Sequence, residues 1–149
     1  MNEQILIDEL QKPEYTGLSD QEAADAINAK TATIRKPVPA DRVQAAAIAS
    51  GLWAIVKIAS QNTGLPNPPR GAAMSFVDWI EAGRPIDMDG GTVQSVGAVL
   101  LSYNLATQEQ LDALQTLADV VIPWTTANDL PEVGIGLVIN ARKVIANGE

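Results

Sequence analysis

The stretch DRVQAAAIASGLWAIVKIASQ, residues 41–61, decides the fold that we expect from the sequence. No charged residue occurs between Arg42 and Lys57, and most positions between them carry alanine, valine, leucine or isoleucine. A helix that is apolar on nearly all sides is normally buried on more than one side. Spanning a bilayer takes about 20 strongly apolar residues, and this stretch is rich in alanine, so we do not expect a membrane span. The stretch predicts a central helix on which a helical domain packs.

The whole chain, residues 1–149, fits a single helical domain. Apolar positions at helical spacing, interrupted by glycine and proline, predict an all-α fold: a compact bundle of about six helices around the central helix. Two capping boxes mark helix starts, since a serine or threonine stands three residues before a glutamate or glutamine. These boxes are Ser19 with Glu22 and Thr107 with Gln110. The expected helices beside the central one are 2–11, 19–28, 69–82, 92–103, 108–121 and 136–146.

The helices expected at 92–103 and 108–121 are separated by only a few residues. Two helices with so short a link usually pack against each other in antiparallel orientation. Their inward positions would include Val96 and Leu100 on the first helix and Leu111 and Leu114 on the second. We therefore predict a helical hairpin in this part of the chain.

Residues 31–39, TATIRKPVP, differ from the rest because they contain β-branched residues and two prolines. An isolated strand is marginal, and Pro37 cannot donate a backbone hydrogen bond. We therefore expect an extended connector. Two interpretations stay open: a linker, or an arm that docks on a neighbouring subunit with Arg35 and Lys36 as anchors.

Charge is unevenly distributed along the chain, whose net charge is −8. Residues 1–29 and 85–149 are acidic, whereas residues 30–84 are basic. This distribution permits attraction within one molecule or head-to-tail contact between copies. A broad nucleic-acid surface is not expected, because phosphate requires a concentrated positive face. Sequence readout of DNA by the 92–121 pair is not expected either, since its second helix has no lysine or arginine.

Residues for catalysis and metal binding are sparse. The chain has no histidine and no cysteine. Asp87 and Asp89 resemble the start of a calcium loop, but the twelfth position, which needs an acid, is Ala98. Asp78 and Glu81 lie one helical turn apart without a nucleophile or base beside them in the sequence. We expect no enzymatic activity, no cofactor, no metal and no small-molecule substrate.

Tryptophan is the other notable residue type, with one each at positions 53, 79 and 124. Trp53 lies midway along the most apolar stretch, which favours a place in the core. Trp124 lies in a loop bracketed by prolines, where a core position and a partner-binding position stay open. Our candidate residues for partner contacts are Arg35, Lys36, Arg42 and Trp124.

Two segments carry a resemblance to a known group of proteins. Residues 13–31, PEYTGLSDQEAADAINAKT, place a tyrosine and a glycine before a capped helix that ends in isoleucine, asparagine and threonine. Residues 124–143, WTTANDLPEVGIGLVINARK, place a turn with leucine and valine before a helix that ends in Ala141 and Arg142. These segments resemble the opening and closing parts of small helical proteins encoded in the structural and assembly gene modules of tailed bacteriophages.

The resemblance implies a non-enzymatic structural or assembly protein of a tailed-bacteriophage virion, at the head, the head–tail connection or the tail. Its partners would be other phage structural proteins or copies of itself, and it would reach the virion after synthesis in the bacterial cytoplasm. The amino-terminal MNEQILIDEL has no basic region, so a secretory signal is not expected. The alternative is a soluble phage effector that binds a host protein.

Overall fold

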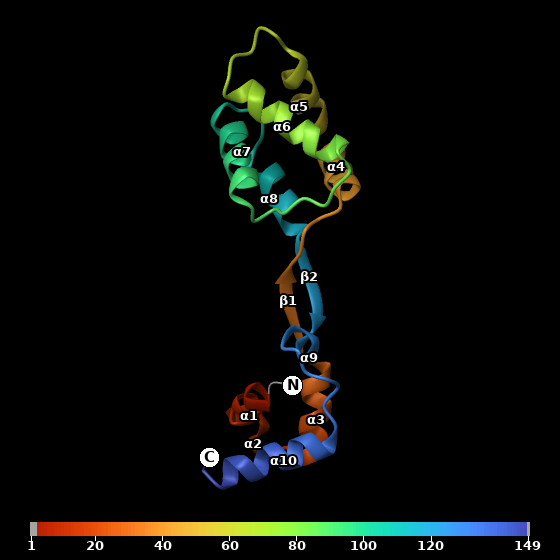
Figure 1. Ribbon diagram of the computed structural model, residues 1–149, viewed down its shortest axis with the longest axis vertical. Helices are drawn as coiled ribbons and strands as arrows, with labels where there is room; N and C mark the ends of the chain where they lie inside the picture. Colours follow the sequence, from red (N-terminus) through yellow and green to blue (C-terminus); the bar gives the residue numbers. More distant parts are fainter. Residues whose placement is uncertain (1–2, 149) are drawn as a thin grey trace. The chain divides into compact units, whose positions relative to one another are not determined.

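The computed structural model describes residues 3–148 and is mostly helical, with ten helices and two short strands in that range (Figure 1). The prediction of a mainly helical fold is confirmed, but the strict all-α class is wrong because of the strands. Asn2, the first residue of the helix expected at 2–11, lies outside the described residues. The elements are α1 (Glu3–Leu10), α2 (Pro13–Thr16), α3 (Asp20–Ala29), β1 (Thr31–Arg35), α4 (Ala40–Ala49), α5 (Leu52–Gln61), α6 (Pro69–Glu81), α7 (Gly91–Ser102), α8 (Gln108–Thr116), β2 (Asp119–Pro123), α9 (Trp124–Ala127) and α10 (Ile135–Ala146).

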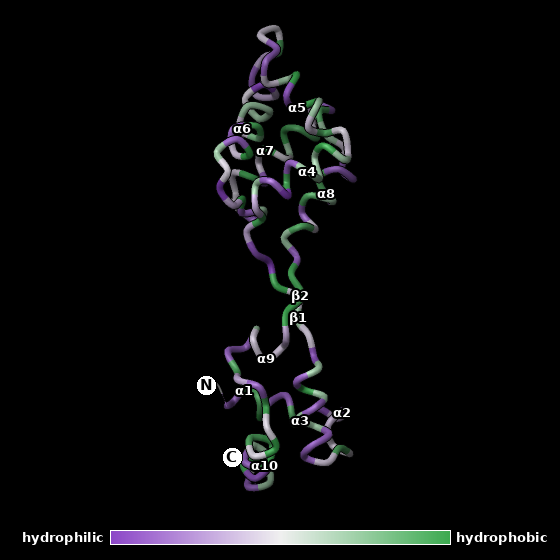
Figure 2. The backbone as a smooth tube through the Cα atoms, turned by 90° about the vertical axis from the view of Figure 1, so that its right-hand side faces the viewer, coloured by the Kyte–Doolittle hydropathy of each residue, from purple (hydrophilic) through white to green (hydrophobic). Residues whose placement is uncertain are grey.

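The chain forms two compact units. Among the described residues, unit 1 comprises residues 3–34 and 121–148, and unit 2 comprises residues 35–120. Each unit has its own cluster of buried apolar side chains. Figure 2 shows hydrophilic and hydrophobic residues alternating along the helices of each unit, as amphipathic helices require. Where the sequence suggested one domain, the buried residues form two cores, with unit 2 inserted into the sequence of unit 1.

Unit 1 is built from α1, α2, α3, α9 and α10. Both α1 and α3 pack against α10, with Leu6, Ile27 and Val138 almost fully buried between them. The predicted capping box at the start of α3 is confirmed. The backbone N–H of Glu22 donates to Ser19 Oγ at 3.1 Å, and the Ser19 N–H donates back to Glu22 Oε1 at 3.2 Å. Unit 1 thus joins segments from both ends of the sequence.

Unit 2 is built from α4 to α8, with α6 packed against α4, α5 and α7. The single central helix predicted over residues 41–61 is wrong, because α4 ends at Ala49 and α5 begins at Leu52. Between them Gly51 adopts a left-handed backbone with φ of 81°, and the two helix axes meet at 101°. Glycine takes this conformation without the clash that a Cβ would cause. Gly51 therefore allows a sharp bend between α4 and α5 within the most apolar stretch of the chain.

The corner also changes which apolar side chains are buried. Leu52 and Val56 are fully enclosed, whereas Ile48 is 58% exposed and Ile58 is 69% exposed. We expected residues 41–61 to be packed on more than one side, but Ile48 and Ile58 leave part of this apolar stretch exposed. Within residues 3–148 no single helix is long and apolar enough to cross a membrane, although the bent α4–α5 pair passes that test by length and composition.

The two strands pair with each other in antiparallel orientation. The Lys36 N–H donates to Ala118 O at 2.9 Å just past one end of the ladder, and the Trp124 N–H donates to Lys30 O at 2.8 Å past the other. The connector expected at 31–39 thus begins with a paired strand. The helix predicted over 108–121 ends at Thr116, because the valines and isoleucine after it extend into β2.

The helical hairpin predicted for residues 92–121 does not form. The capping box of Thr107 and Gln110 is confirmed, with the Gln110 N–H 3.1 Å from Thr107 Oγ1. However, α7 packs on α6 and α8 packs on α4, so α7 and α8 are not packed against each other along their lengths. Their apolar sides face a cavity instead.

Candidate functional site

Arg35, one of the predicted partner contacts, bonds extensively within unit 2. Its Nη2 donates to Asp89 Oδ1 at 2.9 Å and its Nε to Asp89 Oδ2 at 3.2 Å. Its Nη1 donates to Asp119 Oδ1 and to the Gln115 carbonyl oxygen, each at 2.9 Å. Hydrogen bonding to Asp89 and then to Asp119 raises the pKa of Arg35, and the bond from Arg35 lowers the pKa of Asp89. The guanidinium therefore ties β1 to the turn before α7 and to the end of α8.

Lys36 and Arg42 are exposed on unit 2. Neither residue forms an ion pair with another part of the chain that the structure describes. Arg42 lies in the first turn of α4, and Lys36 directly follows β1. These two side chains are therefore available for contacts with another molecule, unlike Arg35.

Trp124 lies in unit 1, at the start of α9, and is partly buried against the core of that unit. The ammonium nitrogen of Lys30 lies 5.4 Å from the centre of its ring, within the range of a cation–π interaction. Of the two positions left open by the sequence, the structure places Trp124 against the core. Trp53 also packs on its core, with its ring centre 6.4 Å from that of Phe76.

Unit 1 contains a buried carboxylate that the sequence analysis missed. Glu9 is 3% exposed, and its carboxylate accepts from Tyr15 Oη at 2.8 Å and from the ammonium groups of Lys12 and Lys30. Burial by itself raises the pKa of Glu9, but the bonds from Lys12, Lys30 and Tyr15 outweigh it and lower the pKa to about 2. The spacing of Glu9 and Lys12 was visible in the sequence, whereas the approach of Lys30 depends on the fold. With Tyr15 and both lysines bonded to its carboxylate, Glu9 has a structural role.

An apolar surface is exposed on the outer side of α5. Ile55 and Ile58 lie one helical turn apart and are 40% and 69% exposed, and Ala54 beside them is exposed as well. We call these three residues the α5 face. Exposed apolar side chains that gather on one face commonly mark a site of protein association.

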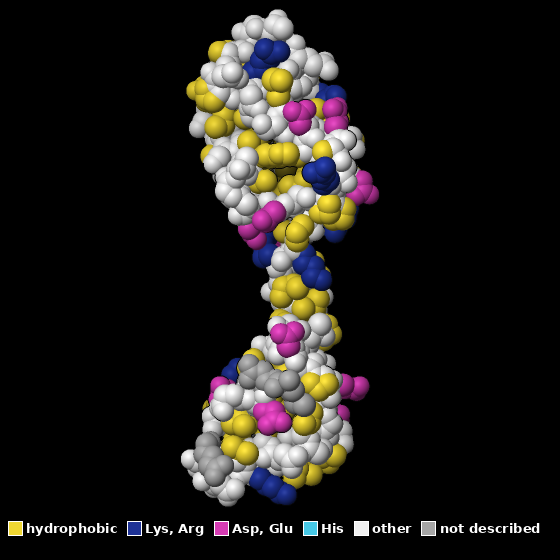
Figure 3. All heavy atoms as spheres, in the orientation of Figure 1, with side chains coloured by type: hydrophobic (Ala, Val, Ile, Leu, Met, Phe, Trp, Pro, Cys, Tyr) yellow, Lys and Arg dark blue, Asp and Glu magenta, His cyan; other side chains and the backbone are white. Residues whose placement is uncertain are grey.

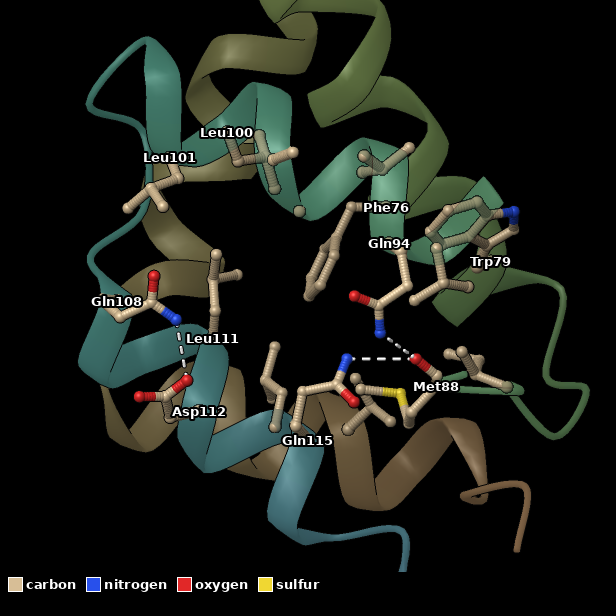
Figure 4. Close-up of a pocket in the computed structure, with 17 residues that line it drawn as sticks. Phe76, Trp79, Met88, Gln94, Leu100, Leu101, Gln108, Leu111, Asp112 and Gln115 are labelled. Carbon is tan, nitrogen blue, oxygen red and sulfur yellow. Dashed lines mark hydrogen bonds between the residues drawn. The ribbon is translucent and has the colours of Figure 1, made fainter. Parts of the chain in front are cut away.

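A cavity of about 360 Å³ lies in unit 2 between α6, α7 and α8. Its volume is within the range of small-ligand sites, about 300–1,000 Å³. Figure 3 shows a hollow on this face of unit 2 bordered by hydrophobic side chains. Figure 4 shows side chains from the three helices and from Met88 around it. Lining residues are Val43, Phe76, Trp79, Ile86, Met88, Val93, Gln94, Val96, Gly97, Ala98, Leu100, Leu101, Gln108, Leu111, Asp112, Leu114 and Gln115.

Two glutamine amides meet on one side of this cavity (Figure 4). Gln94 Nε2 donates to Met88 O at 2.7 Å, and Gln115 Nε2 donates to the same oxygen at 3.1 Å. Gln115 Oε1 accepts from Arg35 Nη2 at 2.8 Å. A carbonyl oxygen only accepts, so it fixes which end of each amide faces it. As a result, the oxygen of Gln94 points toward the middle of the cavity.

The cavity was not predicted from the sequence, because the apolar positions of α7 and α8 indicated a closed hairpin. One signal was present: residues 90–108 contain no charged residue, so α7 has more apolar surface than one packing partner covers. Nowhere in residues 3–148 do three or more acidic side chains converge in a way that could hold a metal ion. Comparison with protein-family models, with curated proteins and with solved structures finds no match to this chain.

Proposed function

We propose that this protein is a non-enzymatic structural or assembly protein of a tailed-bacteriophage virion that acts through protein–protein contacts. The observation that carries the proposal is the joining of two distant segments. Residues 13–31 and 124–143, which resemble the opening and closing parts of such phage proteins, both belong to unit 1. Segments that define one group of proteins are expected to form one folded element, and here they do so across an insertion.

Specific contacts hold the two segments together. The side chain of Asn28 donates to Val133 O and accepts from Val133 N, each at 2.8 Å. Arg142 donates to Asp20 Oδ1 at 2.6 Å and to Tyr15 O at 2.9 Å. Asn28 and Arg142 are among the residues on which the resemblance rests. Their roles in joining the segments give a physical reason for these residue types at these positions.

Contacts with partners are assigned to exposed parts of unit 2. The α5 face offers apolar surface, and Lys36 and Arg42 offer free positive charge. Apolar contact supplies most of the affinity in an interface, while charge at its edge guides association. The partners are other phage structural proteins or further copies of the chain. The protein is made in the bacterial cytoplasm and is incorporated at the head, the head–tail connection or the tail.

A conditional stop codon in the gene tests this proposal. In a host that does not suppress the stop codon, electron microscopy should show incomplete particles, such as heads without tails, and plating should show loss of infectivity. Restoring the chain from a plasmid should restore complete particles. A plasmid copy carrying both Ile55→Glu and Ile58→Glu should fail to restore them. Complete, infectious particles made without the protein would contradict the proposal.

A soluble phage effector that binds a host protein is the second candidate. The α5 face also supports this function, because such a surface suits one host partner as well as a virion partner. The same conditional mutant distinguishes the two. Loss of an effector should reduce the number of phages released per cell while each particle remains complete.

A further inference from the structure

We propose that the cavity between α6, α7 and α8 is a binding site for a small, neutral and largely apolar molecule that carries one hydrogen-bond donor. The site lies apart from the α5 face: none of Ala54, Ile55 and Ile58 lines it. The inference therefore does not depend on the proposed function. It rests on the shape of the cavity, on the chemistry of its lining and on one oxygen atom.

The cavity is open because two consecutive helices diverge. Leu100 and Leu114 line it with almost fully buried side chains, and Phe76 points into it (Figure 4). Leu111 reaches across toward α7, where a Cβ on Gly97 would lie 3.8 Å from Leu111 Cδ1. An engineered apolar cavity of about 150 Å³ holds a benzene molecule. At about 360 Å³ this cavity has room for a larger molecule of two or three aromatic rings.

The lining favours a ligand without charge. No lysine or arginine occurs among the lining residues, and the single carboxylate, Asp112, already accepts from Gln108 Nε2 at 2.7 Å. Moving a charged group from water into such surroundings without a partner is costly. Apolar surface, by contrast, gains about 25 cal/mol for each Å² removed from water. No cationic side chain is present to pair with an anion and Asp112 would repel one, so the site selects against anions.

The Gln94 oxygen supplies a polar contact on the side of the cavity nearest Met88. Its amide nitrogen is held by Met88 O, so its oxygen must face the other way, into the cavity (Figure 4). The neighbouring amide cannot serve, because Gln115 bonds to Met88 and Arg35 at both ends. A hydroxyl or N–H group on the ligand would pair with the Gln94 oxygen. An otherwise identical molecule without that donor would leave the oxygen unpaired.

N-phenyl-1-naphthylamine is a suitable probe, since it is neutral, aromatic and carries one N–H. Its fluorescence should rise on addition of the full-length protein and saturate at one probe per chain. For an apolar molecule of this size we expect a Kd of about 10 µM. Trp79 lines the cavity and should be quenched by the bound probe. The absence of saturable binding up to about 100 µM probe would overturn the proposal.

Competition experiments test the assigned chemistry. 1-Naphthol should displace the probe about fivefold more effectively than 1-methylnaphthalene, because one hydrogen bond is worth about 1 kcal/mol. Gln94→Leu should abolish this preference and leave the affinity for 1-methylnaphthalene unchanged or stronger. Gln108→Leu, which alters another amide at the cavity, should keep the preference. An unchanged preference in Gln94→Leu would contradict the role of that oxygen.

Filling the cavity tests its location. Gly97→Leu places a larger side chain between α7 and α8 and should weaken probe binding at least about tenfold. Ile58→Lys, a matched change on the α5 face, should leave binding unchanged. If Gly97→Leu alters the circular dichroism spectrum, the Gln94→Leu competition still decides the outcome. Loss of binding in Ile58→Lys with retention in Gly97→Leu would place the probe on the α5 face and overturn the assignment to the cavity.

Discussion

At the scale of single residues, the buried Glu9 carboxylate shows how unit 1 is stabilised. Burying a charge is costly unless the charge is paired and hydrogen-bonded. Here Lys12, Lys30 and Tyr15 supply the pairing from three successive parts of the chain. These ion pairs and the hydrogen bond offset the free-energy cost of burial, and the carboxylate links α1, α2 and α3. Removing its charge therefore tests the core of unit 1.

Glu9→Gln should destabilise unit 1 by about 2 kcal/mol, because a charged hydrogen-bonding group is lost while the shape of the side chain is kept. Chemical denaturation followed by circular dichroism measures the change. Asp8→Asn is the matched control: Asp8 is exposed, accepts from Gln4 at 2.7 Å, and should change stability by less than about 0.5 kcal/mol. Equal effects of the two substitutions would show that the buried cluster has no special role.

Glu9 also makes the stability of the fold depend on pH, and the direction follows from its lowered pKa. The pKa of Glu9 is lowered in the folded chain to about 2 from its ordinary value of 4.5. A lowered pKa stabilises the folded state above the unfolded value, and this contribution disappears as pH falls through the folded value. Stability should therefore decline between about pH 5 and pH 2, and Glu9→Gln should decline less. Parallel curves for the wild type and the variant would contradict this origin of acid sensitivity.

At the scale of elements, Gly51 sets the corner between α4 and α5. With φ of 81°, an alanine at this position is strained by about 1 kcal/mol. Gly51→Ala should therefore lower the free energy of unfolding by about that amount. Gly91→Ala is the matched control, because Gly91 lies in the first turn of α7 with open space around it. It should be neutral or stabilising by about 0.5 kcal/mol. A stabilising effect at both positions would mean that the corner does not need glycine.

Arg35 gives a second test at this scale. Arg35→Gln removes the bonds to Asp89 and Asp119 and should lower the denaturation midpoint of unit 2. Lys36→Gln, at the next position along the chain, should leave the midpoint unchanged, because Lys36 is exposed. In the phage, by contrast, Lys36→Gln should impair contacts with partners although the chain remains stable. Equal denaturation midpoints for the two variants would mean that Arg35 does not stabilise unit 2 and is free to contact a partner.

The elements that the sequence predicted well are those with local signals. Both capping boxes appear where their side chains indicated, and α6 and α10 begin and end within about two residues of their predicted bounds. The corner at Gly51 was missed because a glycine within an apolar helical pattern is also tolerated in a continuous helix. β2 was missed because its partner β1 lies far away in the sequence. The cavity required knowing which helices α7 and α8 pack against, and that choice is not a local property.

At the scale of the whole molecule, the chain has two cores rather than one. Length and composition did not reveal this, because the division depends on which apolar faces meet after residues 35–120 fold. Each core has its own tryptophan reporters: Trp124 for unit 1, and Trp53 and Trp79 for unit 2. The stability of each unit can therefore be followed separately.

Glu9→Gln should shift the unfolding transition reported by Trp124 and leave the transition reported by Trp53 in place. Variants that retain one tryptophan each, with phenylalanine at the other positions, make the measurement by fluorescence. We expect only the Trp124 transition to shift, because Glu9 contacts only groups of unit 1 among the described residues. A single transition that moves equally for both reporters would mean that the two cores unfold as one.

We propose that this chain is part of a tailed-phage virion or assists its assembly. The most direct test is quantitative peptide mass spectrometry on purified phage particles, with the amount of this protein expressed relative to the major capsid protein. We predict a fixed, reproducible ratio that remains after further purification of the particles, and its value would distinguish a small ring of copies from a coat-wide component. Absence from particles, together with abundance in the infected cell, would contradict a virion role and favour the effector.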